Sequence, residues 1–241
     1  MLSVPDDVGK ALSPKEEKKL LDACADSRSR CRLAAVLLAL NTGMRYSELR
    51  LLQWSLVDLA RRTVRVGKRK TEAGAGRTIP LNDRATKVFR FWAEQFPGRK
   101  PEHFVFPSER YGAAGDKFEP CVHDTQPTNP INSWKESWES AKTRAKVAIR
   151  FHDLRHTCVT RMLEGGVPLS VVGSILGWSA ATTARMAKRY GHIGEMAQRQ
   201  AVQILDRGLK RSKKGTKGAP SKKHAELQSR SEDVQTPVRP Q

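Results

Sequence analysis

Apolar residues recur every three or four positions along most of the chain, which is the spacing of an amphipathic helix. The first such stretch begins at Ser13–Glu16, a capping-box sequence with proline at the first helical position. A second stretch, residues 29–41, is apolar around most of its surface and predicts a central buried helix. The same pattern predicts further helices over residues 44–54, 82–96, 131–147, 153–164, 168–176 and 194–206.

Two short segments, residues 63–66 and 77–81, instead alternate apolar and polar side chains as strands do. Between them, residues 67–76 form a glycine-containing hairpin with three cationic side chains. Residues 108–129 are predicted to be a peripheral surface loop, because prolines and glycines interrupt the pattern there. The expected fold is mainly α with a small antiparallel β-sheet, which is an α+β class.

The chain carries a formal net charge of +19, to which residues 206–241 contribute +6 through ten Lys/Arg against four Asp/Glu. The remaining +13 belongs to residues 1–205, so the folded part is itself basic and favours a polyanionic partner such as nucleic acid. A merely basic or ribosome-associated protein fits the same composition. We expect a loose lead over residues 1–12, a folded domain over 13–207 and a disordered basic tail over 208–241.

The sequence disfavours both a membrane-spanning protein and a zinc-binding protein. The longest apolar run, Leu33–Leu40, is eight residues and too short to span a bilayer, and no leader-like segment follows Met1. The four cysteines show no Cys-x-x-Cys spacing, so we expect reduced thiols and no zinc site.

Candidate chemistry is concentrated in three separated segments. Phe151–Thr157 contains a His-x-x-Arg sequence, Thr42–Glu48 contains Arg45, and Tyr190 follows downstream. Each segment has an ordinary alternative, because Arg45 and Glu48 are spaced as a common helix ion pair. A metal site at the two histidines of Phe151–Thr157 is disfavoured, since the residue after the first is Asp153 and no third ligand is evident.

Taken in order, four stretches resemble the tyrosine recombinase (phage integrase) family over about residues 10–205. They are Leu40–Trp54, Gly67–Leu81, Phe151–Thr157 and Leu176–Ile193. The resemblance implies an integrase-type catalytic domain that cuts and rejoins DNA during site-specific recombination or integration. It also implies a cytoplasmic protein, bacterial or phage-encoded, with double-stranded DNA and other protomers in a tetrameric synapse as partners.

The resemblance assigns Arg45 as the first catalytic arginine, with Glu48 supporting it. A lysine of the hairpin acts as general acid in the family, and the Lys-Thr pair makes Lys70 the best match, with Lys68 the alternative. Lys68 and Arg69 are also expected to contact DNA. Trp178 stands where the family has a second histidine or, in some members, a tryptophan.

These residues suit attack on a phosphodiester. Arg45 and Arg155 offer planar, permanently charged donors for the charge that develops on phosphate oxygens. Tyr190 is the expected nucleophile, with His152 as its proton acceptor or as a donor to phosphate. Lys70 protonates the leaving 5′-oxygen, and the resulting 3′-phosphotyrosyl link retains the bond energy, so no cofactor or metal is expected.

Two departures from the family keep other functions open. The spacing from Trp178 to Tyr190 is about a helical turn longer than usual, which leaves the role of Trp178 open. Only twelve residues precede Ser13, where family members carry an N-terminal helical domain. The alternatives are a non-catalytic DNA-binding remnant of an integrase and a type IB topoisomerase-like nicking-closing enzyme.

Overall fold

The computed structural model describes residues 9–26, 29–67, 76–111, 122–190 and 202–203. The chain divides into two compact units, Met1–Gly194 and Glu195–Gln241, and only residues 202–203 of the second are described. The helices and strands of residues 9–190 therefore all belong to the first unit.

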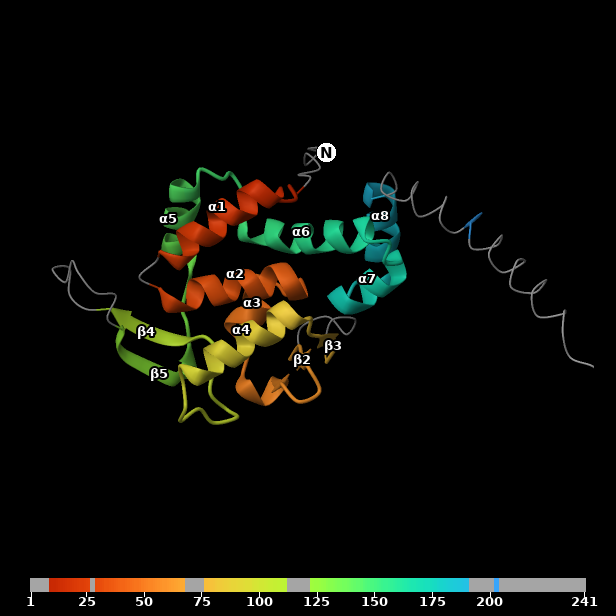
Figure 1. The fold of residues 1–241 in the computed structure, drawn as a ribbon. Helices are drawn as coiled ribbons and strands as arrows, with labels where there is room; N and C mark the ends of the chain where they lie inside the picture. The colour runs from red at the N-terminus through yellow and green to blue at the C-terminus, as the bar shows by residue number, and fades with distance from the viewer. Residues whose placement is uncertain (1–8, 27–28, 68–75, 112–121, 191–201, 204–241) are drawn as a thin grey trace, which may run out of the picture. The chain divides into compact units, whose positions relative to one another are not determined.

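The described residues are mostly helical, with two small antiparallel sheets, which confirms the predicted α+β class. The α-helices, labelled in Figure 1, are α1 (Pro14–Ala25), α2 (Arg30–Thr42), α3 (Tyr46–Arg50), α4 (Asp83–Glu94), α5 (Lys135–Ala145), α6 (Phe151–Glu164), α7 (Leu169–Leu176) and α8 (Ala180–Tyr190). A 3-10 turn, η1 (Trp54–Leu56), follows α3. The strands are β1 (Val57–Asp58), β2 (Thr63–Arg65), β3 (Thr78–Pro80), β4 (Pro107–Tyr111) and β5 (Val122–Pro130).

Local sequence explains several helix ends. The Ser13 hydroxyl accepts from the amide of Glu16 at 3.3 Å, and the Glu16 carboxylate accepts from the amide of Ser13 at 3.0 Å, so α1 begins with a complete capping box. Helices α2 and α7 both end at glycines in the left-handed region, Gly43 at φ 63° and Gly177 at φ 65°. Each glycine turns the chain directly into a segment that carries candidate site residues.

Helix α2 is the centre of the fold, as its all-round apolar surface predicted. It packs against α1, α4 and α6, while α6 leads through α7 to α8 at one end of the unit (Figure 1). An aromatic group joins α3, α5 and α6, where the rings of Trp134 and Phe151 are stacked at 5.9 Å between centroids. Trp134 and Trp138 are both buried and belong to the hydrophobic core.

The first sheet has the order β1-β2-β3, with Val64 opposite Ile79 in the pairing of β2 with β3. The connection from β2 to β3 contains the predicted cationic hairpin, whose residues 68–75 lie outside the described residues. The predicted surface loop over residues 108–129 is wrong for its described parts, because residues 108–111 lie in β4 and residues 122–129 in β5, which pair as an antiparallel ribbon. Residues 112–121 lie outside the described residues.

The helix expected over residues 44–54 is much shorter, since α3 ends at Arg50. Backbone donors just beyond it bond to a distant segment instead of continuing a helix: Trp54 N donates to His103 O at 3.0 Å. Val105 N in turn donates to Leu52 O at 2.8 Å. Pairing with residues 103–105 therefore ends α3 early, whereas Arg45 still lies at the N-terminus of this helix as its N-cap residue.

The segment expected to be a loose lead is described from residue 9 onward, and its last part is packed. Leu12 is buried, and its amide donates to Thr157 Oγ1 of α6 at 2.9 Å. Gly9 lies so close to α6 that a Cβ there would stand 2.1 Å from Cδ2 of His156. Residues 9–12 therefore cover one side of α6 next to a candidate site residue.

Within the described residues, every helix is too short or too polar to cross a membrane. The tail over residues 208–241 lies outside the described residues, and so does all of the predicted helix over 194–206 except residues 202–203.

Candidate active site

Arg45 and Glu48 form the first part of the site at the start of α3. Arg45 is the N-cap residue, and its amide donates to Glu48 Oε2 at 2.8 Å. Its guanidinium donates through Nη1 to Glu48 Oε1, also at 2.8 Å. The carboxylate is buried, whereas 40% of the Arg45 side chain is exposed. The exposed part of Arg45 remains accessible to an anion from outside.

Another arginine, Arg77, which the sequence analysis did not single out, also binds Glu48. Arg77 donates through Nη1 to Glu48 Oε1 at 3.1 Å and through Nη2 to Glu48 Oε2 at 2.8 Å. Burial acts to raise the pKa of Glu48, but the hydrogen bonds from Arg77 and Arg45 prevail and lower it to about 2. Glu48 is therefore an anion at neutral pH, held between two cations.

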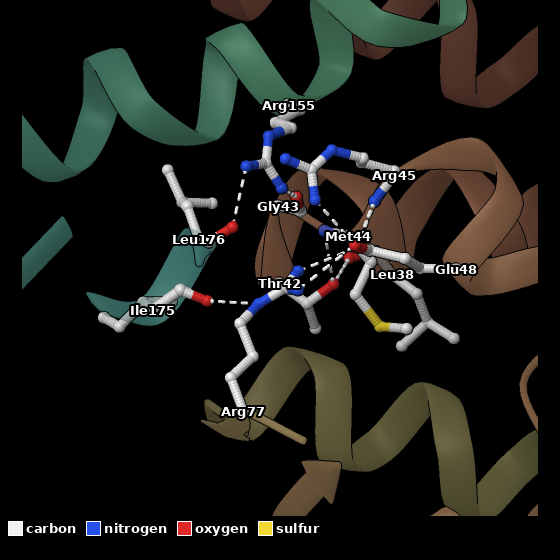
Figure 2. Close-up of polar contacts among 10 residues, drawn as sticks. All are labelled: Leu38, Thr42, Gly43, Met44, Arg45, Glu48, Arg77, Arg155, Ile175 and Leu176. Atoms are coloured by element: carbon white, nitrogen blue, oxygen red, sulfur yellow. Dashed lines mark hydrogen bonds and ion pairs between the residues drawn. The ribbon is translucent and has the colours of Figure 1, made fainter. Parts of the chain in front are cut away.

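Arg155 of α6 lies beside this pair, as Figure 2 shows. It donates through Nη1 to Gly43 O at 2.6 Å and through Nη2 to Leu176 O at 2.9 Å. Burial, followed by the charge of Arg45, lowers the pKa of Arg155 to about 9, so it stays charged at neutral pH. We call Arg45, Glu48, Arg77 and Arg155 the arginine cluster.

Two histidines line the same face of α6. The rings of His152 and His156 are 5.0 Å apart and nearly perpendicular. Burial lowers the pKa of His152, and the charge of Arg155 lowers it further, so His152 is electrostatically linked to the arginine cluster. Burial and the neighbouring His152 lower the pKa of His156 to about 4. Both rings therefore favour the neutral form at neutral pH.

Tyr190, the last residue of α8, is half-buried, and its hydroxyl lies 3.1 Å from Nδ1 of His156. The sequence analysis paired Tyr190 with His152. In the structure His156, one turn further along α6, provides a hydrogen-bond partner for Tyr190. Burial raises the pKa of Tyr190, which keeps the phenol protonated at neutral pH.

Trp178 follows Gly177 at the end of α7, and its amide donates to Gly173 O at 2.9 Å. Its ring packs with Tyr190 against a small buried cluster formed by Val159, Val172 and Leu176. Trp178 therefore helps to fix the turn that joins α7 to α8.

Most of the site residues predicted from the sequence form two adjacent groups in the structure. A third group, on the hairpin, lies outside the described residues. Arg45, Glu48 and Arg155 come together, and His152 lies between them and the pair of His156 and Tyr190. Lys68, Arg69 and Lys70 belong to the hairpin residues that are not described. The hairpin leaves the sheet next to the arginine cluster, because Val66 N donates to the carbonyl of Arg77 at 2.8 Å.

Sequence reasoning missed Arg77 and the role of His156 for different reasons. Arg77 was only the first residue of a predicted strand, and its contacts with Glu48 and with the end of α7 depend on tertiary packing. His156 was visible as the second histidine of the motif, but its partner depends on where α8 ends. The signal available for His156 was its spacing of four residues from His152 on one helix face.

Comparison of the whole chain with known proteins gives its family. Residues 10–195 match the model of the Phage integrase family, and the chain belongs to that family. The integrase of Salmonella phage P22 is 29% identical over 183 residues, which cover 76% of this chain and 43% of that protein. Tyrosine recombinase XerA of Pyrococcus furiosus is 27% identical over 200 residues, covering 81% of this chain and 63% of that protein.

Solved structures show the same fold. The Tn1549 transposon integrase, solved in complex with circular intermediate DNA, matches with a TM-score of 0.58 and 20% identity. The match covers 85% of this chain and 69% of the integrase. The chain spans about half the length of the curated relatives it matches.

Proposed function

We propose that this chain is the catalytic domain of a site-specific tyrosine recombinase, which cuts and rejoins double-stranded DNA through a 3′-phosphotyrosyl intermediate. The observation that carries the proposal is the meeting of Arg45 and Arg155, from distant parts of the chain, around one buried carboxylate. Family membership supports it, as does the DNA bound to the Tn1549 integrase. The proposed domain extends over residues 13–207, with 208–241 as a basic tail.

The two arginines bind the scissile phosphate and stabilise the charge that grows on its oxygens during attack. Arg155 uses two of its five N–H groups on Gly43 and Leu176, which leaves three for a phosphate and fixes the plane of the guanidinium. Arg45 contributes its exposed side. Donors that are fixed before the reaction begins need no reorganisation as charge develops.

Attack by Tyr190 forms the bond from its oxygen to phosphorus and breaks the bond from phosphorus to the 5′-oxygen. The phenolic proton moves to Nδ1 of His156, which is neutral and 3.1 Å away. His152 lies nearer the arginines and donates to a phosphate oxygen. Cleavage on the 3′ side follows the resemblance to the family.

The leaving 5′-oxygen takes a proton from a lysine of the hairpin, for which Lys70 is the proposed donor and Lys68 the alternative. Lys68 and Arg69 would contact the DNA backbone. Supporting this assignment, the hairpin begins and ends beside Arg77, since Gly76 N donates to Val66 O at 3.0 Å at its base. No step of this scheme consumes ATP or employs a metal.

A nicked suicide duplex tests the proposal. Once cleaved, this substrate loses a short fragment and traps the covalent protein–DNA adduct, which a denaturing gel resolves. We expect an adduct with the parent chain and none with Tyr190→Phe, although both bind duplex equally because only one oxygen is removed. A normal adduct yield with Tyr190→Phe would reject Tyr190 as nucleophile, and no adduct with the parent would favour the non-catalytic remnant.

A second experiment separates recombination from simple nicking and closing. A recombinase exchanges strands between two sites on DNA, whereas a topoisomerase-like enzyme only relaxes supercoils.

We propose that protomers assemble as a tetrameric synapse, with residues 194–206 packing on a neighbour. Replacing Ile204 and Leu205 with Asp should then remove higher-order complexes on two-site DNA and spare single-site binding; unchanged complexes in native gels would disprove the docking.

A further inference from the structure

We infer that Arg77 is a positioning residue of this site, which fixes Arg45 through Glu48 and fixes the end of α7 at the same time. The inference rests on the proposed function. It adds a residue that contacts no substrate and acts through two neighbours.

The first neighbour is Glu48, and its four hydrogen bonds are divided equally between two arginines. Each carboxylate oxygen accepts one bond from Arg45 and one from Arg77, at distances between 2.8 and 3.1 Å. The two arginines differ in exposure to solvent. The Arg45 side chain is 40% exposed, whereas the Arg77 side chain is only 7% exposed. Arg45 can meet a phosphate from outside, whereas Arg77 is enclosed.

Arg77 is needed because Glu48 has to stay charged while buried. A buried carboxylate that loses half of its donors is strongly destabilised and draws its remaining cation closer. Without Arg77, Arg45 would be bound more tightly to Glu48 and held away from the phosphate. A guanidinium suits this task, because its flat pair of Nη groups matches both carboxylate oxygens at once.

The second neighbour is the C-terminal end of α7, where helix carbonyls lack partners within the helix. Arg77 Nε donates to Ile175 O at 3.0 Å, and Arg155 Nη2 donates to the next carbonyl, Leu176 O, at 2.9 Å. Figure 2 shows the two guanidinium groups approaching this helix end from different sides. Gly177 and Trp178 follow immediately, and α8 then leads to Tyr190.

Arg77 therefore connects the phosphate-binding arginines to the segment that carries the nucleophile. A small displacement of α7 would move Arg155 and α8 together, and misplacement of a reacting group by about 1 Å can cost on the order of a hundredfold in rate. This makes Arg77 more than a stabilising ion pair, because its loss should change the rate of cleavage in molecules that remain folded and bound.

The test compares Arg77→Gln and Arg77→Lys with a matched variant, Arg65→Gln, at an exposed position of the adjoining strand β2. Single-turnover cleavage of the nicked suicide duplex is measured at saturating protein, with duplex affinity and thermal unfolding measured in parallel. We expect Arg77→Gln to cleave ten- to a hundredfold more slowly with unchanged affinity. Arg77→Lys should recover part of the rate, and Arg65→Gln should cleave normally.

A double-mutant cycle with Arg45→Lys distinguishes positioning from general destabilisation. If Arg77 acts through Glu48 on Arg45, the combined loss in rate should be clearly smaller than the product of the single losses. Multiplicative losses, or normal cleavage by Arg77→Gln, would overturn the inference while parental cleavage still upheld the proposed function. Absence of cleavage by the parent chain would instead reject the proposed function itself.

Discussion

Single arginines in this protein have different tasks because they differ in what they already bind. Arg155 uses two N–H groups on main-chain carbonyls, and Arg77 uses three on a carboxylate and a carbonyl. Arg45 binds Glu48 and keeps an exposed side. Sequence motifs can identify arginines suited to a phosphate, but the number of donors still available depends on the tertiary partners.

Arg155→Lys should lower the rate of adduct formation on the order of a hundredfold, which is typical for loss of one fixed transition-state donor. Lysine carries the charge but cannot hold two carbonyls and a phosphate in one plane. Quenched-flow cleavage of the suicide duplex measures the loss, with Arg90→Lys on the exposed side of α4 as the control. Full activity of Arg155→Lys would show that charge alone suffices.

His156 should make folding depend on pH. Its pKa is about 4 in the folded chain and near 6.5 when unfolded, so between these values the unfolded state binds more protons. The free energy of unfolding should therefore fall as pH drops from about 6.5 to 4. Urea titrations of His156→Gln should show a weaker fall across that window, while His224→Gln should retain the parental dependence. An identical pH dependence in all three proteins would contradict the assigned pKa shift.

At the scale of elements, the turn after α2 needs a glycine at position 43 for two reasons, its left-handed backbone and its close approach to α7. Gly43 has φ 63°, and a Cβ there would stand 2.4 Å from Leu176 Cδ2. Its carbonyl accepts from Arg155, as does the carbonyl of Leu176. The end of α2 and the end of α7 thus approach closely, with Arg155 bound to both.

Gly43→Ala should lower the free energy of unfolding by about 1–3 kcal/mol, because the alanine must adopt a strained backbone conformation and displace Leu176. Gly98→Ala is the matched control, since a Cβ at Gly98 meets nothing within 4 Å. Urea unfolding of the two variants measures the difference. Equal stability of both would mean that the turn rearranges without cost.

Helix starts were predictable where a local capping residue fixes them. Ser13 caps α1, and the side chain of Asn82 accepts from Ala85 N at 2.8 Å at the start of α4. Prediction failed where distant partners decided the backbone. Residues 52–54 pair with 103–105, and residues 107–111 pair with 122–130, which ended one expected helix and replaced an expected loop with strands. Pairings between distant segments leave no periodic trace in either segment alone.

At the scale of the whole molecule, charge should dominate the binding of DNA. The chain carries +19, and residues 206–241 account for +6 of it. Neutralising phosphates releases counterions, so affinity should fall steeply as salt is raised.

Deleting residues 208–241 should weaken duplex binding and reduce the slope of log affinity against log salt, because fewer phosphates are neutralised. A full-length control with the tail Lys and Arg replaced by Gln should behave like the deletion. Both proteins should cleave a pre-bound suicide duplex at the parental rate. An unchanged salt slope would show that the tail does not meet phosphate.

The packing of residues 9–12 along α6 offers a way to observe the nucleophile spectroscopically. Lys10 stands one position after Gly9, whose backbone lies against His156, and 55% of its side chain is exposed. Burial raises the pKa of Cys24, Cys31 and Cys158 to about 11, 12 and 11, which makes their thiols slow to react with labelling reagents. With Cys121 replaced by serine, a fluorophore attached through Lys10→Cys would therefore sit close to the His156 ring that takes the proton of Tyr190, and its emission would report changes at that ring in real time.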